Sequence, residues 1–389
     1  TPKGYVKMGD IKMGDKIICP DNTHSKIIGI YPQEEKDIYK VTFSDGTSTE
    51  CCLDHLWLTQ TKRDREARSW VKGSKKTLRY ANPKKGTVKT LKEIIDTLHI
   101  GENKKSNHYI PITQPIEFEA KNHIIHPYVL GVLIGDGCLK TNVSFTSADS
   151  EIPIYIKTLI PSDYKISEEK TEDKAKNYNI VNVNNGKNNI LKDELRRLNL
   201  WGKYSYEKFI PDEYLFDSIE NRLNLLMGLM DTDGTTDGRF TSFSSTSKIL
   251  AEQFQFIINS LGGTSSIIQR EAFYKNAYDE QVKCRDVFTV SVSLPDSFSI
   301  FNLERKKNKY LPKTKYRPYR AIKKVEFIGK KAAQCIKIDH PDHLYLTNNC
   351  IVTHNTFTTL YAGLKLLNTK HVSDLVYVRS AVESASRSL

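Results

Sequence analysis

Two short segments of this chain repeat one pattern, and that repeat constrains the fold more than any other feature. The first is Tyr128–Gly137, YVLGVLIGDG, and the second is Leu225–Gly234, LLMGLMDTDG. Each places a glycine inside an apolar helical run and ends in an Asp-Gly turn. In this alignment Asp136 and Asp233 are 97 residues apart, the size of a small α/β unit. The sequence therefore predicts an internal duplication in which each half begins with such a helix.

The aligned residues also indicate a chemistry. Gly131 and Gly228 would let the two helix backbones approach closely, because glycine has no Cβ. The helices would then deliver Asp136 and Asp233 to one place. Two converging carboxylates repel each other unless a cation lies between them, and oxygen ligands suit Mg²⁺. We therefore predict a Mg²⁺ site for phosphodiester hydrolysis at this pair; a core helix with a capping turn is the alternative for either motif alone.

The positive charge of the chain is concentrated in two segments. The formal net charge is +12, but residues 61–105 hold fourteen basic and five acidic residues, and residues 304–324 hold ten basic residues and one acidic residue. The remainder is therefore net negative. Either segment alone is compatible with a solvated linker, but the two together favour a polyanion such as nucleic acid as partner.

Composition excludes several classes of protein. A chain of 389 residues with 39% hydrophobic residues can build more than one core, which excludes wholesale disorder. No apolar run approaches the length of a membrane helix, and no secretory signal pattern opens the chain. The seven cysteines are irregularly spaced without a CxxC pair, so neither a disulfide framework nor structural zinc is expected and a reducing compartment is favoured.

Secondary-structure signals change twice along the chain. Residues 5–60 and 322–353 are rich in short β patterns, whereas residues 126–300 mix helical and β patterns. Thr90 is a candidate N-cap for a helix that extends to residue 98. The order predicts one β domain that is interrupted by a mixed α/β insert.

The two repeated motifs resemble those of the LAGLIDADG homing endonucleases. The resemblance implies a pseudo-twofold pair of αββαββα units whose β-saddles lie in the DNA major groove, and it places Asp136 and Asp233 at the metal-binding acids. It also implies that Lys208, in a KFIP segment, lies near the scissile phosphate; an ordinary surface lysine is the alternative. The first motif departs from the family pattern, because Ile134 stands where the second has Asp231. The acid that the family uses for metal is retained.

The second constellation is His354-Asn355-Thr356, which follows a β pattern. An asparagine side chain can attack its own carbonyl, form a succinimide and break the chain. A neighbouring histidine can polarise that carbonyl or protonate the leaving amine, and the threonine hydroxyl is a nucleophile. These three residues alone predict little, so the inference depends on their companions.

The companion segment is 47–59, TSTECCLDHLWLT, and together the two resemble an intein, a Hint-fold protein-splicing domain. The resemblance implies that His55 activates the upstream scissile peptide, and Cys52 stands where that motif usually has threonine. His343 matches the histidine of the C-terminal motif, and the His354–Thr356 segment matches the downstream junction. The expected fold is multi-domain: an all-β, horseshoe-like Hint domain interrupted by an α+β LAGLIDADG endonuclease with two αββαββα repeats.

Two explanations compete for the residue that starts splicing. The chain opens with TPKGYV, which resembles the interior of the usual N-terminal motif, so a cysteine could precede Thr1. Alternatively, the chain resembles the intein class that lacks an N-terminal nucleophile and carries the triplet Trp57, Cys335 and Thr356. In that class Cys335 would attack the upstream peptide directly; a buried structural thiol is the other interpretation of Cys335.

The last segment, 356–389, resembles a host protein of the PhoH ATPase family. Thr356 would be the last residue of a phosphate-binding loop whose glycines and lysine lie in the upstream flank. An unrelated amphipathic tail is the alternative.

These inferences give a complete prediction. Its domains are the N-terminal Hint part (1–60), a basic subdomain that could contact DNA (61–125), the two-repeat endonuclease (126–303), a basic linker (304–325), the C-terminal Hint part (326–355) and the host fragment (356–389). The expected partners are double-stranded DNA and the flanking exteins of a monomer without membrane contact, in the cytoplasm of a bacterial or phage-infected cell. Mg²⁺ would serve the endonuclease, and splicing would need no cofactor. The alternatives are an intein whose endonuclease only binds DNA and a fragment of a PhoH-like ATP-binding protein.

Overall fold

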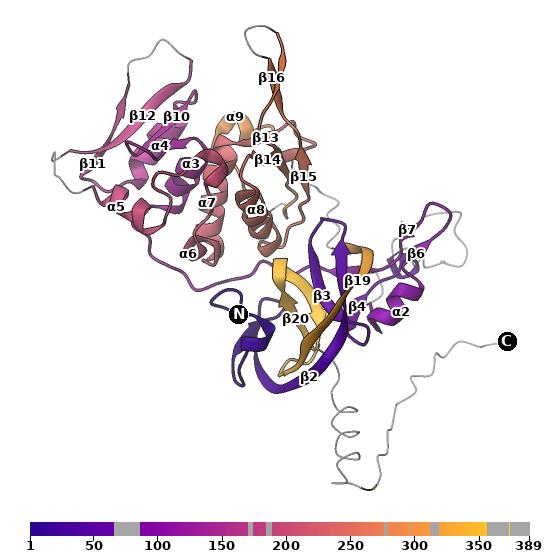
Figure 1. Ribbon diagram of the computed structural model, residues 1–389. Helices are drawn as coiled ribbons and strands as arrows, with labels where there is room; N and C mark the ends of the chain where they lie inside the picture. The colour runs from indigo at the N-terminus through magenta and orange to yellow at the C-terminus, as the bar shows by residue number, and fades with distance from the viewer. Residues whose placement is uncertain are drawn as a thin grey trace, which may run out of the picture.

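A computed structural model of the chain describes residues 1–65, 86–169, 174–183, 189–275, 279–295, 297–311 and 319–355, together with Ser373. The described residues form a β body and an α+β body (Figure 1). No helix among them is both long and apolar enough to cross a membrane. Thr356 and the predicted host segment 356–389 lie outside the description, apart from Ser373.

The β body is built on two long strands from opposite ends of the chain. β2 (His24–Phe43) and β19 (Tyr319–Ile338) pair antiparallel along most of their length, with bulges that bend the pair. β1 (Lys16–Ile18) and β3 (Ser48–Cys52) join β2, and β8 (Tyr109–Pro111) joins β19. Hence the β segments on either side of the insert form one sheet, as the β/mixed/β order predicts.

A hairpin completes the C-terminal part of this body. β20 (Leu344–Thr347) pairs with β21 (Ile351–His354) across the 3₁₀ turn η3 (Asn348–Cys350). Asn349 and Cys350 both have positive φ in this turn, at 53° and 54°, which reverses the chain sharply. The hairpin brings His354 opposite Leu344, and therefore next to His343.

The basic region after residue 60 folds in part onto the β body. α1 (Lys62–Arg65) follows β4 (Leu56–Thr59), which pairs with β5 (Thr87–Thr90); α2 (Leu91–Asp96), β6 (His99–Ile100) and β7 (Lys105–Ser106) come next. Thr90 caps α2 as predicted, since its hydroxyl accepts the Glu93 N–H while the Glu93 carboxylate accepts the Thr90 N–H. Leu91 and Ile94 of this helix enter the core around Trp57.

The α+β body contains two repeats of the same element order. The first is α3 (Pro127–Gly135), β9 (Gly137–Cys138), β10 (Ser144–Ser147), α4 (Glu151–Leu159), β11 (Tyr164–Glu168), β12 (Lys176–Asn182) and α5 (Ile190–Arg197). The second is α7 (Ile219–Thr232), β13 (Gly234–Thr236), β14 (Thr241–Ser245), α8 (Lys248–Ser260), β15 (Ile267–Arg270), β18 (Val287–Ser291) and α9 (Glu304–Lys307), and the short α6 (Asp212–Leu215) precedes it. Their sheets have matching orders, β11-β12-β10-β9 and β15-β18-β14-β13, which confirms the predicted duplication. The second repeat adds a hairpin, β16 (Phe273–Lys275) and β17 (Gln281–Lys283), which projects from it (Figure 1).

Helices α3 and α7 pack closely against each other and so join the two repeats. A Cβ on Gly131 would overlap the carbonyl oxygen of Leu225, and a Cβ on Gly228 would overlap that of Tyr128. Only glycine therefore permits this approach, as the motif alignment predicts. The apolar side chains of both helices fill one core shared by the two repeats.

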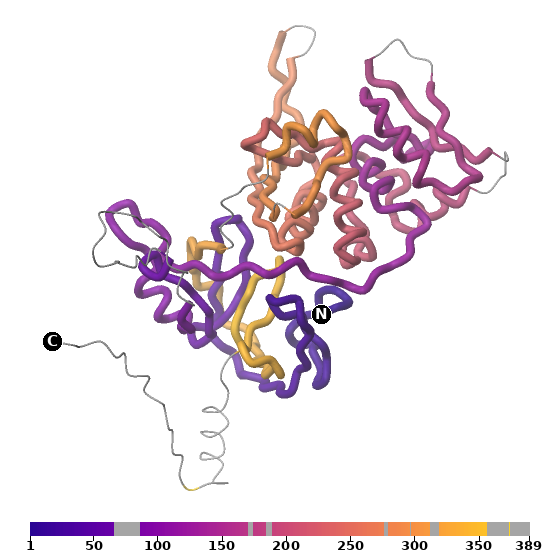
Figure 2. The backbone as a smooth tube through the Cα atoms, turned by 180° about the vertical axis from the view of Figure 1, so that it is seen from behind, coloured from indigo at the N-terminus to yellow at the C-terminus, as the bar shows by residue number. Residues whose placement is uncertain are grey.

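The two bodies contact each other directly. Residues 112–126 cross from the β body to the α+β body (Figure 2) and on the way Ile116 N–H donates to the Ser260 carbonyl at 2.8 Å. Gln255 Nε2 donates to the Asp45 carbonyl at 3.1 Å, and Tyr5 packs edge-on against aromatic rings of the α+β body.

Some of the positive charge of residues 304–325 serves the fold. β19 begins at Tyr319, so the last seven residues of the predicted basic linker belong to a strand. Arg320 is buried in that strand and pairs with Asp45, Nε to Oδ2 at 2.9 Å. Lys306 is buried as well, and Arg305 pairs with Asp149. These side chains satisfy internal partners, so the charge count overstates what this segment offers to a polyanion.

Candidate active sites

The two aligned aspartates lie together, as the motif alignment predicts. Asp136 ends α3 and Asp233 ends α7, and each backbone N–H closes the last turn of its helix at 3.0 Å. Burial and the neighbouring Asp136 carboxylate raise the pKa of Asp233 to about 6, against the lowering effect of Lys208 and Lys306. Burial raises the pKa of Asp136 too. Asp136 is exposed and Asp233 is partly buried, so the pair is accessible from solvent. Two neighbouring carboxylates that repel each other are a donor set that a bound divalent cation stabilises, so these residues fit Mg²⁺.

Lys208 is buried, which excludes the alternative that it is an ordinary surface lysine. The residue is only 3% exposed, and Nζ donates to the carbonyls of Leu133, Gly135 and Gly137 at 3.1, 3.2 and 2.7 Å. Burial lowers the pKa of Lys208 to about 8, with Asp233 and Asp136 opposing the shift. The Lys208 ammonium group therefore binds the carbonyl groups at the end of α3, and it also interacts electrostatically with Asp136 and Asp233.

Lys306 is a second such lysine that the motif search missed. Its Nζ donates to the carbonyls of Met230, Asp231 and Gly234 at 2.8, 2.7 and 2.7 Å, at the end of α7. Lys306 lies 98 residues after Lys208, nearly the 97-residue separation of the aspartates. Extending the internal repeat beyond the two helices would have found it.

The two motifs differ at one aligned position, where the first has Ile134 and the second has Asp231, and these two residues have different surroundings. Asp231 accepts the Tyr128 hydroxyl at 2.8 Å and the backbone N–H groups of Asn302 and Leu303 at 3.1 and 3.2 Å. This carboxylate therefore anchors the segment before α9. The aligned Ile134 is buried in the apolar core, so its lack of an acid leaves the pair of helix-end aspartates intact.

A cavity of about 760 Å³ in the β body gathers residues from both ends of the chain. Cys52 at the end of β3, His55 and Trp57 line it together with Cys335 from β19 and Thr353 from β21. Four of these five residues, all except Thr353, are candidates from the sequence, and they meet because β2 and β19 pair across the insert.

His55 has a defined environment in this cavity. Its Nε2 lies 2.5 Å from Thr353 Oγ1, and the Trp57 ring packs edge-on against it with centroids 5.3 Å apart. Burial and the nearby His354 lower the pKa of His55 to about 4, so the imidazole is neutral at pH 7. Thr353 is the residue that sequence reasoning missed; its position next to His354 was the available signal.

The downstream junction surrounds Asn355 with both predicted histidines. The His343 and His354 rings lie 5.8 Å apart, and the buried Asn355 donates its N–H to the His343 carbonyl at 2.8 Å. His354 Nδ1 lies 2.6 Å from the Asn355 carbonyl oxygen, and because that oxygen only accepts, Nδ1 carries the proton. The carbonyl that succinimide formation would attack is thus already hydrogen-bonded to an imidazole.

A pH titration tests this account of His55. We expect an NMR titration midpoint near pH 4, well below the ordinary histidine value of about 6.5. Since the folded pKa is depressed, the unfolded chain binds the extra proton between pH 4 and 6.5, and the His55 contribution to the free energy of unfolding is lost as the pH falls through that window. His55→Gln should therefore be less acid-sensitive than the unmodified chain in thermal unfolding from pH 7 to 4.5. A midpoint near 6.5 would contradict the desolvated, neutral imidazole.

Three comparisons relate the chain to known proteins. A family model described as "LAGLIDADG-like domain" matches residues 220–294, which include all of α7 after its first residue and the second motif. The chain is also similar to the replicative DNA helicase DnaB of Mycobacterium intracellulare, with 28% identity over 365 residues that cover 92% of this chain. It spans 57% of the length of that relative.

Solved structures with local similarity include those of the homing endonuclease I-DmoI. Mesophilic variants of it align with 16% identity and a TM-score of 0.30 over 44% of this chain and 89% of theirs. I-DmoI in complex with DNA and Mn aligns with 18% identity and a TM-score of 0.28, again over 44% of this chain and 89% of its own.

Proposed function

We propose that this chain is a self-splicing intein with an embedded homing endonuclease. The observation that carries the splicing half is the cavity in which Cys335 meets His55 and Trp57, which precede it by 280 and 278 residues. The nuclease half rests on the LAGLIDADG-like domain at 220–294 and on the paired helix-end aspartates. Its partners would be double-stranded DNA and the flanking exteins, in the cytoplasm of a bacterial or phage-infected cell. The host protein, which the intein would interrupt, would be either a PhoH-like ATPase or a different protein.

Splicing would begin in the cavity. The Cys335 sulfur would attack the carbonyl of the upstream scissile peptide, forming a thioester and expelling the amine, while His55 supplies a hydrogen-bonding imidazole in the same cavity. The Thr356 hydroxyl would then attack that thioester, which frees the thiol and leaves the upstream flank as an ester on Thr356. A cysteine that precedes Thr1 is the other possible first nucleophile.

The junction residues would complete the reaction. The Asn355 side-chain nitrogen attacks its own backbone carbonyl carbon, closing a succinimide and releasing the amine of Thr356. The hydrogen bond from His354 Nδ1 to that carbonyl oxygen polarises it for attack. The freed amine then attacks the neighbouring ester, which converts the link between the flanks into an amide.

The nuclease would use the ends of α3 and α7. Asp136 and Asp233 would hold Mg²⁺, which when bound neutralises charge that develops on the oxygens of the cleaved phosphodiester. Lys208 and Lys306 keep each helix end in position through its carbonyl groups and add positive charge beside the pair. Both lysines and both acids are present, which favours an active nuclease over one that only binds DNA.

The starting nucleophile can be tested with a precursor that carries both flanks. If Cys335 starts splicing, Cys335→Ala should reduce cleavage of the upstream junction by hydroxylamine at least about 100-fold, because no thioester forms. Cys284→Ala is the matched control, since that thiol is exposed on the α+β body. Unimpaired upstream thioester formation in Cys335→Ala would assign the first step to a residue before Thr1.

A further inference from the structure

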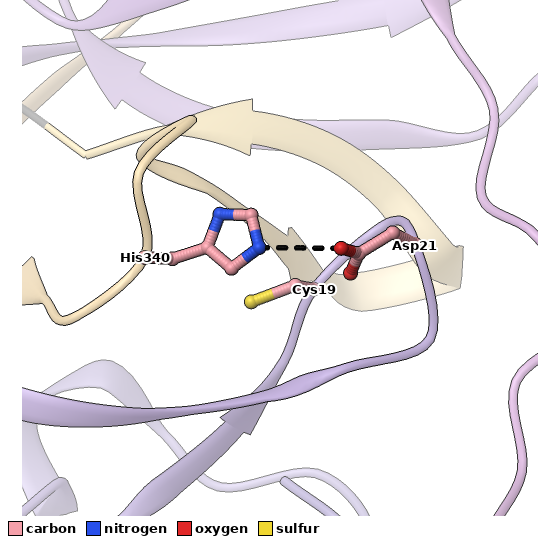
Figure 3. A group of neighbouring side chains, drawn as sticks. All are labelled: Cys19, Asp21 and His340. Carbon is pink, nitrogen blue, oxygen red and sulfur yellow. Dashed lines mark hydrogen bonds and ion pairs between the residues drawn. The ribbon is translucent and has the colours of Figure 1, made fainter.

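Three metal-ligating side chains converge at a turn of the β body that neither proposed reaction uses. Cys19 follows β1, Asp21 lies in the turn between β1 and β2, and His340 follows β19 (Figure 3). One ligand atom from each, the sulfur, a carboxylate oxygen and a ring nitrogen, lie within 4.8 Å of one another. Because His340 is more than 300 positions from Cys19 and Asp21, no local sequence motif identifies the cluster.

Local hydrogen bonds hold this cluster in place. Asp21 Oδ1 accepts the Thr23 N–H at 3.0 Å and the Thr23 hydroxyl at 2.7 Å, which leaves Oδ2 facing His340 Nε2 at 3.3 Å. The Asp342 N–H approaches the other ring nitrogen of His340 at 3.2 Å. Cys19 is fully buried, whereas Asp21 is at the surface, so the cluster is open to solvent on the carboxylate side.

The donor set selects the kind of ion. Thiolate and imidazole ligands suit zinc and related transition metals, whereas Ca²⁺ and Mg²⁺ prefer oxygen ligands only. Ligand atoms around a tetrahedral zinc lie about 3.3–3.8 Å apart, so a contraction of about 1 Å would suffice here. Coordination through Nε2 places the ring proton on Nδ1, and the 3.2 Å contact with the Asp342 N–H would be given up.

We propose that Cys19, Asp21 and His340 bind one divalent transition-metal ion, zinc by preference, with a water molecule in the fourth position. This site is additional to the proposed splicing and nuclease functions. The ion would tie the N-terminal turn to the loop that leads into His343, whose N–H already donates to the His340 carbonyl at 3.0 Å. Binding would therefore stiffen the approach to the downstream junction.

Cobalt(II) titration of the full 389-residue chain tests the proposal, with excess Mg²⁺ present to occupy carboxylate sites. We expect one equivalent to bind with a thiolate-to-cobalt charge-transfer band and the strong visible bands of a tetrahedral site, both removed by zinc. Cys19→Ser should abolish the charge-transfer band, and His340→Gln should weaken binding at least about tenfold. Cys284→Ser, which removes an exposed thiol outside the β body, should change neither.

Several outcomes would overturn this site. One is a charge-transfer band that survives in Cys19→Ser, and another is a band that disappears in Cys335→Ala instead, since that would place the ion in the cavity. If the variant of the buried residue, Cys19→Ser, fails to fold, the variants Asp21→Asn and His340→Gln decide, and unchanged cobalt affinity in both would contradict the proposal.

Discussion

Replacing Asn355 by alanine should abolish release and ligation of the downstream flank. Alanine has no side-chain amide, so no succinimide can form, although His354 Nδ1 would still hydrogen-bond the backbone carbonyl. We expect a loss of ligated product of at least about 10³-fold, which corresponds to about 4 kcal/mol of activation free energy. The measurement is mass spectrometry of the products from a precursor that carries both flanks.

The matched control for this variant is Asn103→Ala. Asn103 is an exposed asparagine in the turn between β6 and β7, so its loss should leave splicing unchanged. Upstream thioester formation should persist in Asn355→Ala, because the cavity that contains Cys335 and His55 does not depend on the Asn355 side chain. Ligated flanks from Asn355→Ala would show that the downstream chemistry proposed here is wrong.

The double variant Asp136→Asn, Asp233→Asn should abolish DNA cleavage and leave splicing intact. Amide groups keep the shape of both helix ends but remove the negative charges that attract Mg²⁺, so a loss of at least about 10³-fold is expected. The assay is cleavage of linear DNA that spans the uninterrupted host gene, and a mobility-shift measurement reports DNA binding separately. Splicing should persist because Asn355 and the cavity belong to the other body.

Asp193→Asn provides the control within the same body, since Asp193 is exposed on α5 and pairs only locally with Arg196. It should cut DNA at the rate of the unmodified chain. Cleavage retained by the double variant would remove the nuclease assignment from this pair of aspartates. A chain that binds the DNA but never cuts it, even before substitution, would support the alternative of a decayed nuclease.

Local features of the fold were predictable from residue order. The glycines of the repeated motifs predicted the close approach of α3 and α7, and Thr90 predicted the start of α2. The short β patterns within residues 24–43 belong to one long strand, β2. The Pro32–Asp37 stretch breaks the β pattern in the sequence. It nevertheless remains part of β2 because it pairs with β19, and the β-bulges let the paired strands bend without ending.

The sites were predictable only in part. Residue type and motif spacing pointed to Asp136, Asp233 and His55, but Thr353 and Lys306 appear only when distant segments are placed together. The burial of Lys208 could not be read from its KFIP segment, because it depends on the carbonyl groups at the end of α3. Arg320 adds to the positive charge of its segment in the sequence, but its guanidinium group is buried against Asp45 and is not available to DNA.

The sequence by itself determined the duplication, the reactive residue types at the junctions and the interruption of a β domain by an insert. Those features are encoded in short windows: helical periodicity, capping residues and the chemistry of a few neighbouring side chains. The tertiary structure alone decided which groups meet. Pairing of β2 with β19 sets Cys335 opposite Tyr31 and on the same cavity as His55, and it brings His340 to Cys19. Strand register between segments some 300 residues apart is a property of the whole packed core, and no local pattern contains it.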